Sequence, residues 1–124
     1  MTELGRRAVA CQHWRWMPGM LAIDSCNEEH PARVIDARRS VVYEDNDGAI
    51  HEGVVSRSDL PDFSDPATLG CLLALMREAL DDSRIHCRTR ANKFRVYSGV
   101  TPIGEWANSE GAALVAALEA TNAR

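Results

Sequence analysis

Cysteine and histidine side chains in the N-terminal part of the chain have types and spacing that suggest a zinc site. They form a C-x-H pair, a gap of twelve residues and a C-x3-H pair. Thiolate and imidazole ligands suit tetrahedral zinc, although the C-x-H opening is tighter than the usual spacing. Thiols in a reducing compartment, together with surface histidines, are the commoner explanation. A zinc-stabilised binding module is therefore the third of our functional hypotheses, after the two given at the end of this section. We expect the protein to need no cofactor. The candidate metal ligands are Cys11, His13, Cys26 and His30.

A second group of candidates comes from residues 84–95, which are rich in arginine and alternate as the strands of a hairpin do. Arginine forks onto phosphate and an aromatic ring can stack on a base, so one face of this hairpin could bind an anion or a nucleotide. The alternative is a solvated face whose charge is balanced by acidic residues elsewhere. The candidate ligand-binding residues are His86, Arg88, Arg90, Lys93, Arg95 and Tyr97, joined by Arg38, Arg39 and Arg57 if the fold brings these to the same patch.

Tryptophan residues are the third group. Trp14 and Trp16 stand at alternating positions, where both can line one face of a strand, and Trp106 lies near the other end of the chain. An exposed pair would mark an interface or a stacking platform. Packing of these rings in the core beneath the helices is the commoner alternative. The candidate interface residues are Trp14 and Trp16.

No pattern in the sequence points to catalysis. Glu28-Glu29 and Asp81-Asp82 are adjacent carboxylates, and neighbours on a helix or strand point apart. The motifs of a nucleophilic serine, a phosphate-binding loop, a dinucleotide-binding fold and a zinc protease are absent from the sequence. We expect a protein that is not an enzyme and has no catalytic residues.

Length and composition are those of an ordinary globular protein. The 124 residues suit a single domain, residues 1–124, with 45% hydrophobic and 26% charged residues. A net charge of −4 gives no general reason to bind nucleic acid. No apolar run reaches the roughly 20 residues that a membrane span needs, and the first residues are too polar for a signal peptide. We expect a cytoplasmic protein with neither a membrane nor bulk nucleic acid as a partner.

A central helix is the best-marked element among those that must position these residues. Asp65 is the expected N-cap, and Pro66 follows at a position where its missing N–H costs nothing. Asp81 and Asp82 oppose the helix dipole at the other end, so we expect them to be exposed on a frayed terminus. Apolar residues recur at helical spacing, at Leu69, Leu72, Leu73, Met76 and Leu80.

Weaker patterns predict the remaining elements. Helices are predicted at about 3–11 and, after the N-cap Ser109, at 110–121. Residues 99–104 are predicted to be a loop. Strands are predicted at about 20–23, 41–43, 50–55, 84–90 and 94–98, with an Asp-Gly turn at 45–48. This order predicts the α+β class, as an α/β sandwich of about three helices packed on an antiparallel sheet of four or more strands.

In several of these elements the chain resembles small phage and prophage proteins of the "phage ABA sandwich" family. The resembling parts are Trp14, Trp16 and Met17 after the first helix, the segment PDFSDPA at 61–67, and the Ala- and Leu-rich helix at 110–119. Residues 33–57 depart from the family pattern and are the expected seat of properties specific to this chain. The family has no catalytic motif to carry over. The resemblance implies a phage or prophage origin and a small accessory role in the host bacterial cytoplasm.

An arginine-rich face on an otherwise acidic domain without catalytic motifs favours binding over chemistry. Our first hypothesis is a non-enzymatic phage anti-defence protein that binds and sequesters a small anionic host immune messenger of the cyclic nucleotide type. A site shared between subunits suits a small domain, so we expect a homo-oligomer. The alternative is a protein-interaction module that binds a host or phage protein through the region of Trp14 and Trp16 or through an exposed edge strand.

Overall fold

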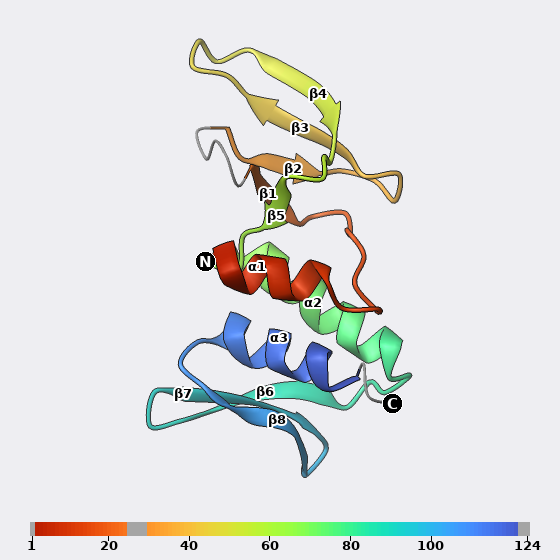
Figure 1. The fold of residues 1–124 in the computed structure, drawn as a ribbon, viewed down its shortest axis with the longest axis vertical. Coiled ribbons are helices and arrows are strands. Elements are labelled where there is room, and N and C mark those ends of the chain that lie inside the picture. The colour runs from red at the N-terminus through yellow and green to blue at the C-terminus, as the bar shows by residue number, and fades with distance from the viewer. Residues whose placement is uncertain (1, 25–29, 122–124) are drawn as a thin grey trace.

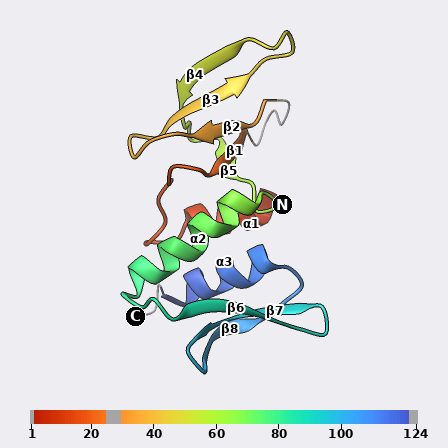
Figure 2. The same cartoon turned by 180° about the vertical axis from the view of Figure 1, so that it is seen from behind.

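The computed structural model describes residues 2–24 and 30–121, which form three helices between two antiparallel sheets (Figures 1 and 2). The five-stranded sheet has the order β4-β3-β2-β1-β5, and its strands are β1 (Leu21–Asp24), β2 (Ala32–Val34), β3 (Ser40–Glu44), β4 (Ile50–Val54) and β5 (Asp59–Pro61). The three-stranded sheet has the order β6-β7-β8, and its strands are β6 (Ile85–Arg90), β7 (Lys93–Ser98) and β8 (Thr101–Ala107). The helices are α1 (Thr2–Val9), α2 (Pro66–Ala79) and α3 (Glu110–Thr121). In the described part of the chain, none of these helices has the length and apolar character to cross a membrane.

The predicted α+β class is confirmed, but two sheets are present instead of the single sheet that the sequence patterns suggest. The reason lies in α3, which carries buried residues on several sides and not along one stripe. One side of α3 packs on β7 and β8, and the other packs on α1 and α2. The helices therefore form a central layer that has a sheet on each side (Figure 1).

Strand β8 corrects the predicted loop over residues 99–104. Pro102 and Gly104 indicate a loop in sequence, but both are tolerated here because β8 is an edge strand with a register irregularity against β7. Gly104 has a φ of +78°, and a Cβ at this position would lie 3.3 Å from the backbone nitrogen of Ala117. Glycine thus allows both the backbone conformation and the close approach of α3.

The larger core fills the space between α3 and the three-stranded sheet and continues among the three helices. Ile85 of β6, Val96 of β7 and Ile103 of β8 are each at most 4% exposed. They belong to the same buried cluster as Leu114 and Leu118 of α3. Because side chains alternate along a strand, the residues between these buried positions lie on the opposite face of the sheet, away from α3.

A smaller core packs against the five-stranded sheet. Met20, Val34, Val41 and Val55 form this cluster and are at most 8% exposed. Trp14 packs against both this cluster and the larger core, so its ring connects the sheet to the helical layer.

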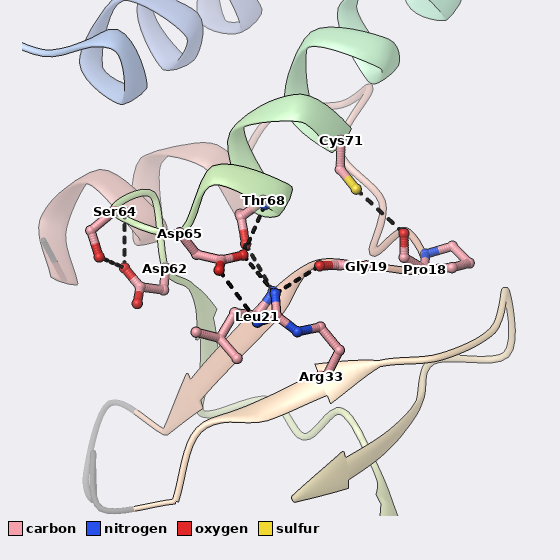
Figure 3. A network of polar contacts seen from close by, with 9 residues as sticks. All are labelled: Pro18, Gly19, Leu21, Arg33, Asp62, Ser64, Asp65, Thr68 and Cys71. Carbon is pink, nitrogen blue, oxygen red and sulfur yellow. Dashed lines mark hydrogen bonds and ion pairs between the residues drawn. The ribbon is translucent and has the colours of Figure 1, made fainter.

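The predicted N-cap of α2 is confirmed, and it also links the helix to the five-stranded sheet (Figure 3). The carboxylate of Asp65 accepts hydrogen bonds from the backbone N–H of Thr68 at 3.0 Å and from its hydroxyl at 2.8 Å. Arg33 of β2 donates to both carboxylate oxygens, at 2.6 and 3.3 Å, and to the carbonyl of Gly19 at 3.0 Å. Burial opposes ionisation of Asp65, but the bonds from Arg33 and Thr68 outweigh it, so the pKa of Asp65 lies below its ordinary value.

The end of α2 differs from the prediction of two exposed carboxylates. Asp81 is exposed, with a φ of 48°, whereas Asp82 is half-buried. Asp82 accepts hydrogen bonds from the side chain of Arg84 at 3.1 Å and from the hydroxyl of Ser98. These contacts hold the pKa of Asp82 well below its ordinary range and attach the start of β6 to the end of β7. The other adjacent pair, Glu28-Glu29, falls outside the described residues.

Candidate functional site

The outer face of the three-stranded sheet carries the predicted basic residues on two neighbouring strands. The hairpin and its alternation are as predicted, because the residues on this side alternate with the buried ones that face α3. The cross-strand pairs on the outer side are His86 with Tyr97, Arg88 with Arg95, and Arg90 with Lys93. We call this surface, together with Trp106 of β8, the basic-aromatic face. The three strands that carry it form the lowest sheet in the view of Figure 1.

Tyr97 is the centre of the aromatic contacts on this face. The guanidinium carbon of Arg88 lies 4.7 Å from the centroid of the Tyr97 ring. The guanidinium carbon of Arg95 lies 5.9 Å from that centroid and 5.8 Å from the centroid of Trp106. The rings of His86 and Tyr97 stack with centroids 6.1 Å apart, and Trp106 meets Tyr97 edge-on at 6.5 Å. Arginine and aromatic side chains thus alternate across the sheet surface within cation–π distance.

Hydrogen bonds orient the cations. The Nε of Arg88 donates to Nε2 of His86 at 2.9 Å, and the Nε of Arg95 donates to the carbonyl of Gly104 at 2.9 Å. Nδ1 of His86 lies 2.8 Å from the carbonyl of Arg84. This arrangement is that of a neutral imidazole, which donates from Nδ1 and accepts at Nε2. The guanidinium groups of Arg88 and Arg95 are therefore oriented before any ligand binds.

The positive charge of the basic-aromatic face is not neutralised locally. Arg84, just before β6, is paired with Asp82, but none of the ion pairs among the described residues involves Arg88, Arg90, Lys93 or Arg95. Lys93 donates to the side-chain oxygen of Asn108. Arg90 is exposed and has no side-chain partner within the described ranges. These cations are consequently available to an anion.

The structure does not bring Arg38 and Arg39 to this face. Both lie in the turn between β2 and β3 of the five-stranded sheet, on the other side of the helical layer (Figure 1). Arg57 lies between β4 and β5 of the same sheet. These three arginines therefore cannot bind the same ligand as the hairpin residues, because the two groups lie on different sheets.

Trp14 and Trp16 do not line a strand. They lie in the extended connection between α1 and β1, and both rings are partly buried. Their centroids are 5.5 Å apart in an edge-to-face arrangement, and Trp14 meets Phe63 in the same manner at 6.4 Å. Both tryptophans are thus packing residues, with Trp14 against both cores and Trp16 against the smaller one.

A cavity of about 1030 Å³ brings the tryptophan pair together with two of the separated arginines. Trp14 and Trp16 line it from one side, and Arg39 and Arg57 line it from the turns of the five-stranded sheet. These residues are far apart in sequence, and no local sequence motif predicts that they lie close together.

The described part of the zinc pattern does not assemble. Cys11 is buried in the larger core, whereas His30 lies beside Tyr43 of β3, with ring centroids 6.3 Å apart. His13 is partly exposed after α1, and Cys26 falls outside the described residues. Within the residues that the structure describes, no three His, Cys, Asp or Glu side chains are grouped closely enough to hold a metal ion.

Comparisons with models of protein families, with curated proteins and with solved structures found no match. The chemistry of the basic-aromatic face is therefore the basis for a functional proposal. This face offers guanidinium groups for an oxyanion and aromatic rings for a planar group.

Proposed function

We propose that the protein binds a small anionic ligand of the cyclic nucleotide type on the basic-aromatic face and sequesters it without chemical conversion. The observation that carries this proposal is the Tyr97 ring flanked by Arg88 and Arg95, beside cations that have no carboxylate partner in the described part of the chain. Phosphate oxygens would accept hydrogen bonds from the guanidinium groups, and the base would stack on an aromatic ring.

The proposed setting is the host bacterial cytoplasm during phage infection, where removal of a signalling nucleotide would blunt an antiviral response. Such a role requires affinity alone, which agrees with the lack of catalytic motifs in the sequence. This setting rests on the resemblance of Trp14, Trp16 and Met17, of residues 61–67 and of residues 110–119 to phage ABA sandwich proteins, and both the resemblance and the setting are part of the proposal.

A homo-oligomer is also part of the proposal. Small ligands are usually bound in concave sites that cover most of their surface. The outer face of a three-stranded sheet is open on one side, so a second copy lying over the ligand would complete the enclosure. Sedimentation with and without ligand tests this point, because the proposal predicts a dimer or a larger oligomer in the bound state.

A thermal-shift screen against cyclic mono-, di- and trinucleotides and ADP-ribose derivatives tests the ligand class. A ligand that binds the folded state alone stabilises it by about 2.7 kcal/mol at a hundredfold excess over its dissociation constant. We expect one nucleotide class to raise the melting temperature. The zinc hypothesis is tested in the same plate, because it predicts that a chelator lowers the melting temperature.

A protein-interaction module is the second candidate, and strand β4 favours it. β4 is an edge of the five-stranded sheet, and each of its five residues is exposed. Ile50 and Val54 on this strand are 68% and 62% exposed. An exposed apolar edge can receive a strand from a partner. This candidate predicts a flat nucleotide screen and the loss of a crosslinked phage or host protein when Ile50 and Val54 are replaced by lysine.

A further inference from the structure

The cavity beside Trp16 lies away from the basic-aromatic face and has the makeup of a separate binding site. Its volume of about 1030 Å³ is at the upper end of the range of small-molecule pockets. The connection between α1 and β1 forms one wall with Trp14, Trp16, Met17 and Pro18. Apart from Arg15, which is paired with Glu78, that wall is apolar and contains two indole rings.

The opposite wall is cationic. Arg39 and Arg57 line it, and neither side chain has an ion-pair or hydrogen-bond partner among residues 2–24 and 30–121. Arg15 also lines the cavity but is paired with Glu78. Among the described residues that line the cavity, Asp59 alone carries a carboxylate, which accepts a hydrogen bond from the backbone N–H of Ser56 at 2.8 Å. The lining therefore carries an excess of positive charge that is not neutralised internally.

Both arginines stand on tight turns whose backbones are held in place. The backbone N–H of Arg39 donates to the carbonyl of Asp36 at 3.2 Å, and the carbonyl of Arg39 accepts from Val55 at 2.9 Å. Arg39 has a φ of 65°, a conformation that a residue with a side chain adopts only when its surroundings impose it. Arg57 lies in the turn that Ser56 and Asp59 close, with the N–H of Asp59 3.2 Å from the carbonyl of Ser56. The backbone that carries the two cations is thus fixed, while their exposed side chains are free to orient toward a ligand.

The apolar wall is held equally firmly. The thiol of Cys71 donates to the carbonyl of Pro18 at 3.3 Å, and Arg33 donates to the carbonyl of Gly19 at 3.0 Å (Figure 3). Trp14 anchors Trp16 through their edge-to-face contact. The indole Nε1 of Trp14 is itself buried, without a hydrogen-bond partner in the described part of the chain, so this ring is seated in the protein and not free to turn toward solvent.

We infer that this cavity binds a small organic anion that carries a planar ring, with its oxyanion held by Arg39 and Arg57 and its ring placed against Trp16. Guanidinium groups recognise carboxylate and phosphate alike, so the ligand class includes aromatic carboxylates and mononucleotides. The inference is independent of the proposed function, because the two sites lie on different sheets and share no residue.

Tryptophan fluorescence tests the inference and separates it from the basic-aromatic face. The chain has three tryptophans, of which Trp14 and Trp16 line the cavity and Trp106 belongs to the other face. The measurement therefore uses the full chain with Trp106→Phe, so that all tryptophan emission comes from Trp14 and Trp16. The ligands are benzoate and adenosine 5′-monophosphate as ring-bearing anions that do not emit in the tryptophan range, inorganic phosphate as an anion without a ring, and adenosine as a ring without a charge.

We expect saturable quenching by at least one ring-bearing anion and binding at least about tenfold weaker for phosphate or adenosine alone, because each lacks one of the two contacts. Arg57→Gln should weaken binding of the anion by about tenfold or more, since a charge-assisted hydrogen bond is lost. Arg38→Gln is the matched control, because Arg38 is exposed beside Arg39 but does not line the cavity. Unfolding midpoints equal to that of the parent protein ensure that each variant is folded.

Two results would overturn the inference: the absence of quenching by both ring-bearing anions at millimolar concentration, and equal weakening of binding by Arg57→Gln and Arg38→Gln. Where the mononucleotide does quench, equal affinity for adenosine would also overturn it. If benzoate binds and the mononucleotide does not, the inference holds and the ligand is an aromatic carboxylate; the reverse result assigns a mononucleotide. Neither outcome bears on the basic-aromatic face, because Trp106 is absent from the measurement.

Discussion

The guanidinium of Arg88 lies over the ring of Tyr97, 4.7 Å from its centroid, and is held there by a hydrogen bond to His86 at 2.9 Å. Cation and ring are thus arranged in advance on an exposed sheet surface, so a ligand would spend little conformational entropy in ordering them. A guanidinium plane and a phenol ring also provide two surfaces on which a base can stack.

Replacement of Tyr97 tests the stacking contribution. Tyr97→Leu should weaken nucleotide binding by about 1–3 kcal/mol, the usual value of a base–aromatic stack. Tyr97→Phe is the matched control, because it retains the ring and should keep the affinity within about threefold. Calorimetric titration with the nucleotide class identified in the thermal screen measures both. Equal losses in the two variants would remove stacking from the account.

Charge reversal at Arg90 tests the electrostatic contribution with little structural disturbance. Arg90 has no side-chain partner within the described ranges, so Arg90→Glu breaks no internal contact there. We expect it to weaken nucleotide binding by about tenfold or more through the loss of a guanidinium and the addition of a like charge. Arg6→Glu on α1 makes the same change of charge on an exposed helix surface and should leave affinity almost unchanged. If both reversals weaken binding equally, the effect belongs to the net charge and not to this face.

The link between Asp65 and Arg33 predicts a pattern in stability. Asp65→Ala removes both the cap and the ion pair and should lower the free energy of unfolding by about 2–3 kcal/mol. Asp65→Asn retains an N-cap acceptor and should cost about 1 kcal/mol, because mainly the charge is lost. Urea unfolding measures both values. Equal costs would show that the charge contributes nothing beyond the cap.

The same variants predict a pH dependence. The pKa of Asp65 is lowered in the folded protein, so its ionised form adds stability that is present above the ordinary pKa of 3.8 and is lost as pH falls below it through the folded pKa. The stability difference between the parent protein and Asp65→Asn should therefore be constant near neutral pH and shrink in acid. A difference that grows as pH falls would contradict the ion pair.

Alanine substitutions at Gly104 and Gly70 should have opposite effects on stability. Gly104→Ala combines a φ of +78° with a Cβ 3.3 Å from the backbone of Ala117 and should destabilise the protein by about 1–3 kcal/mol. Gly70→Ala lies in α2, where a Cβ meets nothing within 4 Å, and should stabilise the protein by up to about 1 kcal/mol. Thermal unfolding of both variants checks the signs, and a stabilising Gly104→Ala would refute the close approach of α3.

The features that the sequence predicted well are determined by local residues. The N-cap Asp65 accepts a hydrogen bond from the backbone N–H of Thr68, only three residues away. In the β6–β7 hairpin, the alternation of inward and outward side chains is visible over a few residues. The separation of His86, Arg88 and Arg90 from the buried Ile85 follows directly from that alternation.

The features that it missed depend on residues far apart in the chain. β2 and β5 have three residues each, too few to display a period. Gly104 is predicted to lie in a loop because glycine is typical of loops. The reason for glycine here is the close approach of α3 at Ala117, which is more than ten positions away in the sequence. The cavity is lined by Trp16 from the α1–β1 connection, by Arg39 from the β2–β3 turn and by Arg57 from the segment between β4 and β5. No regular spacing in the sequence relates these three segments.

The most direct test of the central claim is a two-dimensional ¹H–¹⁵N NMR titration of the protein with the nucleotide class selected by the thermal screen. The account predicts saturable shifts of the amides of β6 and β7 and of the Trp106 indole N–H, while the indole signals of Trp14 and Trp16 stay in place at ligand levels that saturate the face. Shifts confined to β4, or to residues around Trp16, with the Trp106 indole unmoved, would contradict the assignment of nucleotide binding to the basic-aromatic face.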